Sequence, residues 1–338
     1  MRPPAPPPAI RLADVARQAG VSTITASRAL RTPGQVAPET RARIEEAARR
    51  LGYVPNLLAG ALASARTRTV GVLVPTIASS IFAATINGLT AVLEEAGYAL
   101  LMAQSDYDPG RETRVLSALL GHRPEGVVSI GAPLAPASAS LLAAAVRAGT
   151  VVVETWEIPH APLGAAVGFD NAAVGRAVAT RFAVAGRRRL LFAGGTDPRA
   201  SARFDGFDAA AREAGLRPPA RVRLPVPAVM DNATDACLAA EGPDSLAETD
   251  AVFAATDVHA MGLLTGFRRR GREVPRDVAV VGLGDLDIAR HALPALTSVR
   301  IDGAAIGRRA AALILEGQDA DAPTLIDVGF SIVERDSG

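Results

Sequence analysis

The sequence predicts an all-α headpiece at the N-terminus, followed by an α/β body made of two doubly wound parallel-sheet lobes. Helical periodicity dominates residues 12–51, whereas short apolar strand-like runs alternate with helical stretches from Thr69 onward. A chain of 338 residues is also too long for one ordinary hydrophobic core. These observations predict a small headpiece (10–53) and a larger, divided body (69–338).

The first two helices of the headpiece form a helix-turn-helix pattern. Apolar residues recur at the spacing of one helical face until Gly20, and Ser22 then offers an N-cap for a second helix. The first apolar face comprises Leu12, Val15, Ala16 and Ala19. Small apolar residues of the second helix (Ala26, Ala29, Leu30) can pack on the first, and its other face carries Thr23, Ile24, Ser27 and Arg28. Such a motif places its second helix in the major groove of DNA.

A third helix and the charge distribution favour DNA binding over the alternative, an ordinary αα-hairpin in a core. Ile44, Ala47, Ala48 and Leu51 lie on one face of a helix over 40–51. Residues 1–66 hold ten Arg and four acidic residues, a net charge of +6; the whole chain carries +1, so residues 67–338 carry −5. A basic headpiece on a mildly acidic body suggests that phosphate contacts are confined to the headpiece.

Composition limits the remaining classes. The single cysteine, Cys237, excludes a disulfide framework and a Cys-rich metal site, which fits a reducing cytoplasm. Residues 1–9 are Pro-rich and predict a disordered arm rather than a signal peptide. No apolar run reaches the length of a membrane-spanning helix. We therefore expect a cytoplasmic protein without a membrane partner.

The body reads as two series of strands and helices. The predicted strands are 69–74, 98–103, 126–130 and 150–154, then 165–169, 190–194, 251–255 and 278–283. Continuous apolar strands separated by helices are typical of parallel sheets covered on both faces. Ligands of such lobes lie outside the carboxyl ends of the strands. We therefore expect a cleft lined by the segments that follow each strand.

Residues 54–68 connect the headpiece to the body. Apolar residues follow Pro55, but Gly60 weakens a helix there by about 1 kcal/mol relative to Ala. A plain linker and a hinge helix that orders only on DNA both fit this segment.

Several motifs resemble the lactose-repressor (LacI) family of bacterial transcription regulators. They are DVARQAGVSTITASRAL (14–30), TRARIEEAARRLGYVPN (40–56), ARFDGF (202–207), TDVHAMG (256–262), VPRDVAVVGLGD (274–285) and PALTSVRID (294–302). VGFDN (167–171) and VGLGD (281–285) resemble the gluconate-repressor branch. The resemblance implies a periplasmic-binding-protein-like body, a homodimer and a pseudo-palindromic operator. It also implies lobes of 69–162 with 296–321 and 163–292 with 323–335, joined by crossovers near 161–165, 290–296 and 320–325.

The resemblance assigns DNA contacts. Thr23, Ile24 and Arg28 stand where the family reads base edges, and an Arg on guanine is the commonest specific contact. Phosphates or adjacent bases would be contacted by Ser22, Thr25, Ser27 and Arg41. In the hinge, Asn56 stands at the helix start, and Leu62 stands where the family inserts a Leu into the minor groove. Arg11 and Ala37 replace the family's usual Ser or Thr caps.

The resemblance also assigns an effector site. Arg203 aligns with the family's effector-binding Arg, although a surface Arg on a helix is the alternative. Further candidates are Ser79, Ser80, Ile81, Phe82, Phe169, Asp170, Thr256 and Asp285. Asp257 is expected to cap a helix rather than bind, and Gly284 replaces the family's effector Asp. A retained Arg with fewer carboxylates suits an anionic effector such as gluconate, its lactone or its phosphorylated relative.

An enzyme and a free sugar-binding protein are the two alternative functions. The four histidines (His122, His160, His259 and His291) are scattered, and no metalloprotease, nucleophile-elbow or phosphate-loop motif occurs. A free sugar-binding protein fits the body but not the basic headpiece. We therefore expect no enzyme, cofactor or metal site, and a transcriptional regulator, most simply a repressor, of a carbohydrate or sugar-acid utilisation operon.

Overall fold

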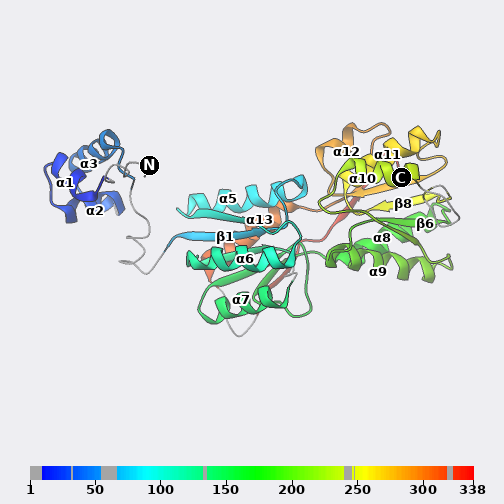
Figure 1. Cartoon of the computed structure of the whole chain (residues 1–338), viewed down its shortest axis with the longest axis horizontal. Coiled ribbons are helices and arrows are strands. Elements are labelled where there is room, and N and C mark those ends of the chain that lie inside the picture. Colours follow the sequence, from blue (N-terminus) through cyan, green and yellow to red (C-terminus); the bar gives the residue numbers. More distant parts are fainter. Residues whose placement is uncertain are drawn as a thin grey trace, which may run out of the picture. The chain divides into compact units, whose positions relative to one another are not determined.

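The computed structural model describes residues 10–31, 33–54, 67–131, 135–239, 246, 248–317 and 323–338. It divides into two compact units, Met1–Thr67 and Arg68–Gly338 (Figure 1). The predicted arm (1–9) and the hinge residues Asn56 and Leu62 lie outside the described residues.

The first unit is a three-helix headpiece. It comprises α1 (Leu12–Gln18), α2 (Thr23–Arg31), a 3-10 turn, η1 (Pro33–Gln35), and α3 (Pro38–Leu51). Gly20, with φ of 64°, occupies the left-handed region and permits the turn between α1 and α2. One apolar cluster holds the helices together, with Val15, Ala26 and Ile44 fully buried at its centre. The periodicity-based helices of the headpiece are thus confirmed.

Two helix starts in the headpiece lack a side-chain cap. Neither Arg11 before α1 nor Ala37 before α3 accepts a capping hydrogen bond through its side chain. At α1 the Asp14 carboxylate accepts from the Arg11 backbone N–H at 3.0 Å instead. The loss of the family's cap at Arg11 is therefore partly compensated from inside the helix.

The first lobe of the second unit is a six-stranded parallel sheet in the order β11-β5-β4-β3-β1-β2. Its strands are β1 (Thr69–Val74), β2 (Ala99–Gln104), β3 (Gly126–Ile130), β4 (Val151–Thr155), β5 (Ala165–Gly168) and β11 (Leu325–Asp327). Its helices are α5 (Ala83–Glu95, preceded by the 3-10 turn η2, Ser80–Phe82), α6 (Pro109–Gly121), α7 (Pro136–Arg147) and α13 (Gly303–Glu316). Figure 1 shows α5 and α13 together in this lobe, although they are far apart in the sequence.

The second lobe is a six-stranded sheet in the order β12-β10-β9-β8-β6-β7, parallel except for the edge strand β12. Its strands are β6 (Leu190–Gly194), β7 (Ala220–Arg223), β8 (Ala251–Ala254), β9 (Ala279–Leu283), β10 (Thr297–Arg300) and β12 (Ser331–Val333). Its helices are α8 (Asn171–Val184), α9 (Pro198–Glu213), α10 (Met230–Ala239), α11 (Asp257–Arg269) and α12 (Asp287–His291).

Both sheets are covered on both faces, which explains their continuous apolar strands. In β1, Val72 packs in the cluster with α5 and α13, while its neighbour Leu73 packs in the cluster with α6 and α7. In β6, Phe192 packs in the cluster with α8 and α9, while its neighbour Leu191 packs in the cluster with α10 and α11. A strand buried on two faces has no polar alternation, as the sequence pattern predicted.

The predicted lobe boundaries need correction. Strand β5 does not open the second lobe but closes the first, where Val153 pairs with Ala165. Strand β10 belongs to the second lobe, and β11 belongs to the first. The chain therefore crosses at 169–170, 301–302 and 328–330, after the predicted positions. Sheet membership follows from hydrogen bonds to strands distant in sequence, which local patterns do not specify.

Membrane-spanning helices and metal-binding clusters are both absent from the part of the chain that the structure describes. No described helix has both the length and the apolar character needed to cross a membrane. No group of three or more His, Cys, Asp or Glu side chains among these residues is arranged to hold a metal ion.

Candidate DNA-binding and effector sites

Helix α2 presents its polar face to solvent. Thr23, Ile24 and Arg28 are exposed, while Ala26 and Ala29 on the opposite face are buried against α1 and α3. Ile24 is 69% exposed, which is unusual for a large apolar side chain and leaves it available for contact with another molecule. The face predicted to enter the major groove is therefore open.

The hydroxyl of Ser22 fixes the start of this helix. Its Oγ atom accepts from the Thr25 backbone N–H at 3.1 Å and lies 2.9 Å from the Thr25 hydroxyl. This confirms the predicted cap and orders the first turn of α2, where Thr23 and Ile24 lie.

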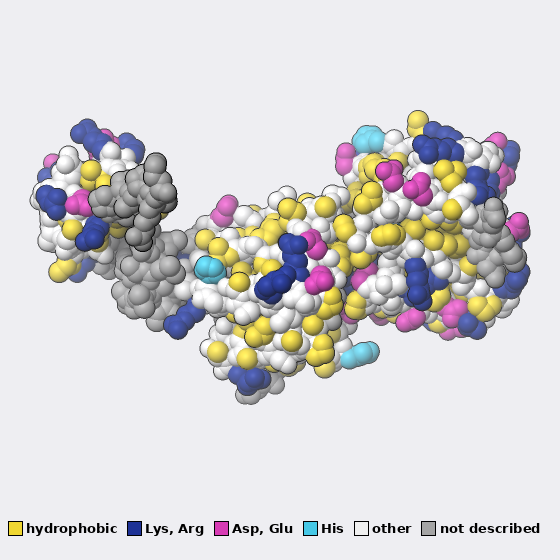
Figure 2. All heavy atoms as spheres, in the orientation of Figure 1, with side chains coloured by type: hydrophobic (Ala, Val, Ile, Leu, Met, Phe, Trp, Pro, Cys, Tyr) yellow, Lys and Arg dark blue, Asp and Glu magenta, His cyan; other side chains and the backbone are white. Residues whose placement is uncertain are grey.

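The three headpiece helices differ in the charged residues that their sequences contain. In α1, Arg17 lies 3.2 Å from Asp14, and in α3 Glu46 lies within 2.8 Å of both Arg49 and Arg50. Helix α2 contains Arg28 and Arg31 but no acidic residue. Figure 2 shows dark-blue Arg side chains on the visible face of the headpiece. A helix with basic and no acidic side chains is suited to approach a phosphate backbone.

The second unit holds a cleft between its two lobes, with two chambers. The larger chamber, together with the open solvent at its mouth, has a volume of about 540 Å³. There the first-lobe residues Ser79, Phe82 and Trp156 face the second-lobe residues Arg203 and His259. The smaller chamber, of about 370 Å³, lies against the ends of the first-lobe strands. Tyr107, Asp197 and Arg199 line both chambers and therefore mark where they meet.

Arg203 is the most deeply buried charge in the larger chamber. It is 7% exposed, and its Nη1 atom donates to Oδ1 of Asn171 at the start of α8. Desolvation lowers the pKa of its guanidinium to about 10, partly opposed by the nearby Asp197 carboxylate. Arg203 remains positively charged at neutral pH and lines the chamber between the lobes, so it is not a surface arginine.

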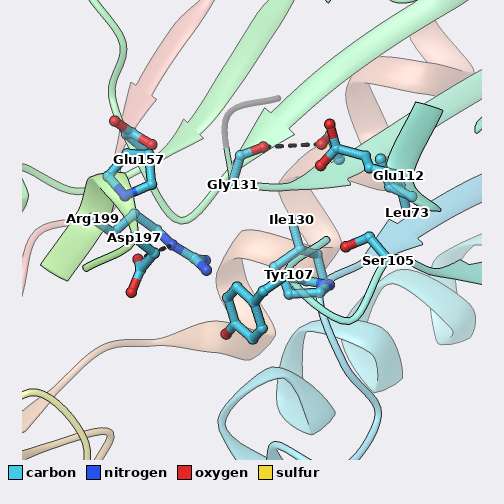
Figure 3. Close-up of a pocket in the computed structure, with 12 residues that line it drawn as sticks. Leu73, Ser105, Tyr107, Glu112, Ile130, Gly131, Glu157, Asp197 and Arg199 are labelled. Atoms are coloured by element: carbon cyan, nitrogen blue, oxygen red, sulfur yellow. Dashed lines mark hydrogen bonds and ion pairs between the residues drawn. The ribbon is translucent and has the colours of Figure 1, made fainter. Parts of the chain in front are cut away.

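Arg199 and Tyr107 shape the junction of the chambers. The Arg199 guanidinium lies 5.3 Å from the Phe82 ring centre, and its Nε is 3.7 Å from Oδ1 of Asp197. Figure 3 shows Arg199 and Asp197 on the side opposite Ser105 and Glu112, with Tyr107 between them. Tyr107 holds a left-handed φ of 58°, and burial raises the pKa of its phenol. Non-glycine residues in the left-handed backbone conformation occur preferentially at ligand sites.

Unpaired polar atoms concentrate in this cleft. Six buried side-chain nitrogen or oxygen atoms of the described residues have no hydrogen-bond partner. Four of the six belong to residues that line the chambers: Nε of Arg203, Oε2 of Glu157 and both ring nitrogens of His259. Buried polar atoms are paired in more than about nine cases in ten, so such a cluster indicates a missing ligand.

The structure brings together five of the nine predicted effector residues. Ser79, Phe82, Arg203 and Thr256 line the larger chamber, as does Ile81. Ser80 and Asp285 line a neighbouring hollow instead. Phe169 is fully buried in the core against Trp156, and the exposed Asp170 caps α8 by accepting from the Ala173 N–H.

Asp285 is held away from the chambers by ion pairs. Its two carboxylate oxygens bind Arg300 at 2.7 Å and Arg335 at 2.5 Å, which lowers its pKa despite partial desolvation. The cap of α11 is also reassigned, because the Thr256 hydroxyl accepts from the His259 N–H while Asp257 binds Ser298 and the Leu286 N–H. A one-residue shift along a loop changes which side chain faces the cavity.

The sequence reasoning missed Tyr107, Asp197, Arg199, Glu157 and His259. All five follow a strand end or lie in the first turn of the next helix, where the parallel-sheet rule expects ligands. The position after a strand end identifies a segment that can bind a ligand. It does not identify which side chains in that segment face the cleft.

The comparisons with known proteins follow the same division of the chain. Residues 11–56 match the model of bacterial regulatory proteins of the lacI family, and residues 179–338 match a periplasmic binding protein-like domain. The HTH-type transcriptional regulator GntR of Pseudomonas aeruginosa is 35% identical over 96% of this chain and 95% of its own length. This chain belongs to the lacI family of bacterial regulators.

Other lacI-family members agree along the whole length. The regulators GntR and IdnR of Escherichia coli are 30% and 31% identical, and each alignment covers at least 95% of both chains. A LacI-family regulator from Silicibacter pomeroyi superposes with a TM-score of 0.86 over 97% of this chain and 99% of that chain, at 31% identity. The lac repressor dimer bound to operator shares the fold, with a TM-score of 0.82 over 98% of this chain and 99% of that chain, at 20% identity. This chain is therefore a transcriptional regulator of the DNA-binding kind, with the predicted two-lobed body.

Proposed function

We propose that this regulator represses a carbohydrate or sugar-acid utilisation operon and responds to a small-molecule effector bound between its lobes. One observation carries the proposal: unpaired buried polar atoms gather with the Arg203 guanidinium in the cleft between the lobes. Relatives that match over nearly the whole of this chain are named transcriptional regulators, and one similar solved structure is a transcriptional regulator CelR–cellobiose complex. A chain that binds DNA and also has an effector cleft can regulate transcription in response to a metabolite.

The chemistry of the cleft favours a sugar acid. Arg203 offers an unused Nε donor, and a guanidinium binds a carboxylate through two parallel hydrogen bonds. The carboxylates of Glu157 and Asp197 are acceptors for sugar hydroxyls in the adjoining space. Because Asp285 is taken by Arg300 and Arg335, the loop after β9 adds no negative charge to the Arg203 chamber. Gluconate, its lactone and 6-phosphogluconate are the first candidates.

On the DNA side, we assign base reading to Thr23, Ile24 and Arg28 and backbone contacts to Ser22, Thr25, Ser27 and Arg41. The support is the exposed polar face of α2 and its cap at Ser22. Asn56 and Leu62 complete the assignment as hinge contacts on the resemblance alone. The assignment includes a homodimer, because two headpieces read the two halves of a pseudo-palindrome.

The test measures effector binding and operator release in the full chain. Operator duplexes are first selected from random DNA by the protein itself. Calorimetry and gel shifts then use D-gluconate, 6-phosphogluconate, gluconolactone, D-glucose and cellobiose. We expect a sugar acid to bind and to release the operator, and Arg203→Ala to bind operator but to lose at least about tenfold in ligand affinity.

Arg212→Ala is the matched control, because Arg212 lies on the same helix with its side chain exposed and pairs only locally with Asp208. It should behave like the wild type in both assays. Tight binding of a neutral sugar, with none of the acids, would show that the sugar-acid assignment is wrong and leave the regulator assignment intact. Failure to select any operator would overturn the regulatory role of the headpiece.

A further inference from the structure

The imidazole of His259 occupies the wall of the Arg203 chamber without a structural role of its own. His259 is the third residue of α11 and is 1% exposed. The cap of this helix uses the Thr256 hydroxyl and the backbone N–H of His259, so the ring is not needed to satisfy the helix start. Close packing of α11 on α10 is made by Gly262, where a Cβ would lie 2.2 Å from the Met230 carbonyl oxygen. The ring is therefore not needed to cap α11 or to pack α11 against α10.

Both ring nitrogens of His259 lack a hydrogen-bond partner. The Pro225 carbonyl lies near enough to favour the protonated ring, but it completes no hydrogen bond to either nitrogen. Apolar side chains of Val226, Ala255 and Leu283 line the same chamber. A desolvated imidazole in such surroundings destabilises the fold unless something else pairs with it.

The charge state of the ring limits what pairs with it. Desolvation lowers the pKa of His259 to about 4, so the ring is neutral at physiological pH. The other ionisable groups lining this chamber are Tyr107, Asp197, Arg199 and Arg203. A neutral imidazole has one donor and one acceptor nitrogen. A hydroxyl of the ligand can both donate and accept, so it can pair with either nitrogen of a neutral imidazole. A carboxylate only accepts, and Arg203 is already assigned to bind it.

We infer that His259 is a specificity-determining residue that hydrogen-bonds a hydroxyl of the effector close to the carboxylate end held by Arg203. This inference rests on the proposed sugar-acid function. It adds the part of the effector that His259 recognises. His259 and Arg203 share the larger chamber, while Glu157 lines only the smaller one. The hydroxyl read by His259 is thus on carbon 2 or 3 of a gluconate-like acid, and the far end of the chain lies toward Glu157.

The test compares His259→Leu with His259→Gln by calorimetry on the full chain, using D-gluconate and its 2-deoxy, 3-deoxy and 6-deoxy forms. Leu keeps the volume and removes both polar atoms, while Gln retains a donor and an acceptor. We expect His259→Leu to bind D-gluconate about tenfold or more weakly and His259→Gln to recover most of that loss. One of the 2-deoxy and 3-deoxy forms should bind the wild type weakly but bind His259→Leu as well as D-gluconate does.

Stability and DNA binding separate this role from a structural one. Removing an unpaired buried imidazole should leave the melting temperature equal or higher, and operator affinity without ligand should not change. His291→Leu is the matched control, because that histidine is exposed and outside the chambers.

Two failures are distinguishable. Equal D-gluconate affinity of the wild type and His259→Leu, with Arg203→Ala still impaired, overturns the inference alone. Absence of binding of every sugar acid to the wild type overturns the proposed effector class and this inference with it. A His259→Leu variant with a clearly lower melting temperature would show a structural role and also overturn the inference.

Discussion

Arg203 donates from Nη1 to Oδ1 of Asn171, and the side-chain amide of Asn171 donates in turn to the Trp156 carbonyl oxygen, 3.1 Å away. The Trp156 indole N–H donates to the Thr85 hydroxyl at 3.0 Å. Asn171 begins α8 in the second lobe, whereas Thr85 lies in α5 of the first. The Arg203 guanidinium is therefore positioned by a hydrogen-bond chain that joins both lobes.

Asn171→Ala should weaken effector binding without removing the guanidinium. Loss of a hydrogen bond to a buried charged group costs about 1.5–3 kcal/mol, and here part of that cost is expected in the affinity for D-gluconate, about a tenfold loss. Calorimetry measures it. Arg176→Ala, also on α8 but in an exposed pair with Glu213, is the control and should change little. Equal affinities of Asn171→Ala and the wild type would show that Asn171 does not position Arg203.

Gly175→Ala should displace helix α9, which carries Arg203. A Cβ at Gly175 would lie 1.9 Å from the Arg203 carbonyl oxygen, and rigid backbone cannot yield as a side-chain tip can. Overpacking of this kind costs about 1–3 kcal/mol of unfolding free energy, and ligand affinity should fall with it. Gly121→Ala at the end of α6, with nothing within 4 Å, should be neutral or slightly stabilising. Urea unfolding of both variants measures the contrast, and similar effects would refute it.

Arg28→Ala should cost about 1–3 kcal/mol of operator binding and relax the sequence preference, because the exposed guanidinium is assigned to a base edge. Arg41→Ala, assigned to the DNA backbone, should weaken all sequences alike and reduce the salt slope by about one. Repeating the operator selection with each variant measures both effects. Loss of affinity with unchanged preference in both variants would mean that α2 does not read bases.

Asp257 should make the stability of the body depend on pH. Burial raises the pKa of its carboxyl from 3.8 to about 6, against hydrogen bonds from Ser298 and Leu286 that lower it. The unfolded chain ionises near the ordinary value, so the folded state loses stability as the pH rises from about 4 to about 6, and the full penalty persists above that. Asp257→Asn removes this ionisation.

The unfolding free energy of Asp257→Asn minus that of the wild type should therefore rise by about 1–3 kcal/mol between pH 4 and pH 7. Fluorescence of Trp156, the single tryptophan, reports the unfolding of the body in urea. Asp170→Asn controls for the loss of one carboxylate at an exposed helix cap. A difference that is flat with pH would contradict the assignment.

The sequence alone was sufficient for the headpiece, for most strands and for the cleft segments. Helical periodicity, the Gly20 turn and the Ser22 cap depend on residues only a few positions apart. A short stretch of sequence is therefore enough to predict them. Arg203 was predicted as a cleft residue because its motif carries the family resemblance, and it lines the larger chamber. The apolar strand runs show that both sheets are covered, since two-sided burial removes polar alternation.

Only the tertiary structure decided which lobe each late strand joins and which side chains face the cleft. Residues 325–327 pair with 166–168, and the backbone hydrogen bonds of this pairing join segments that are nearly half of the chain apart in sequence. Asp285 faces Arg335 instead of a ligand, and His259 faces the cavity instead of the core. Such choices depend on the direction of a side chain after long-range packing, and no local pattern encodes that direction.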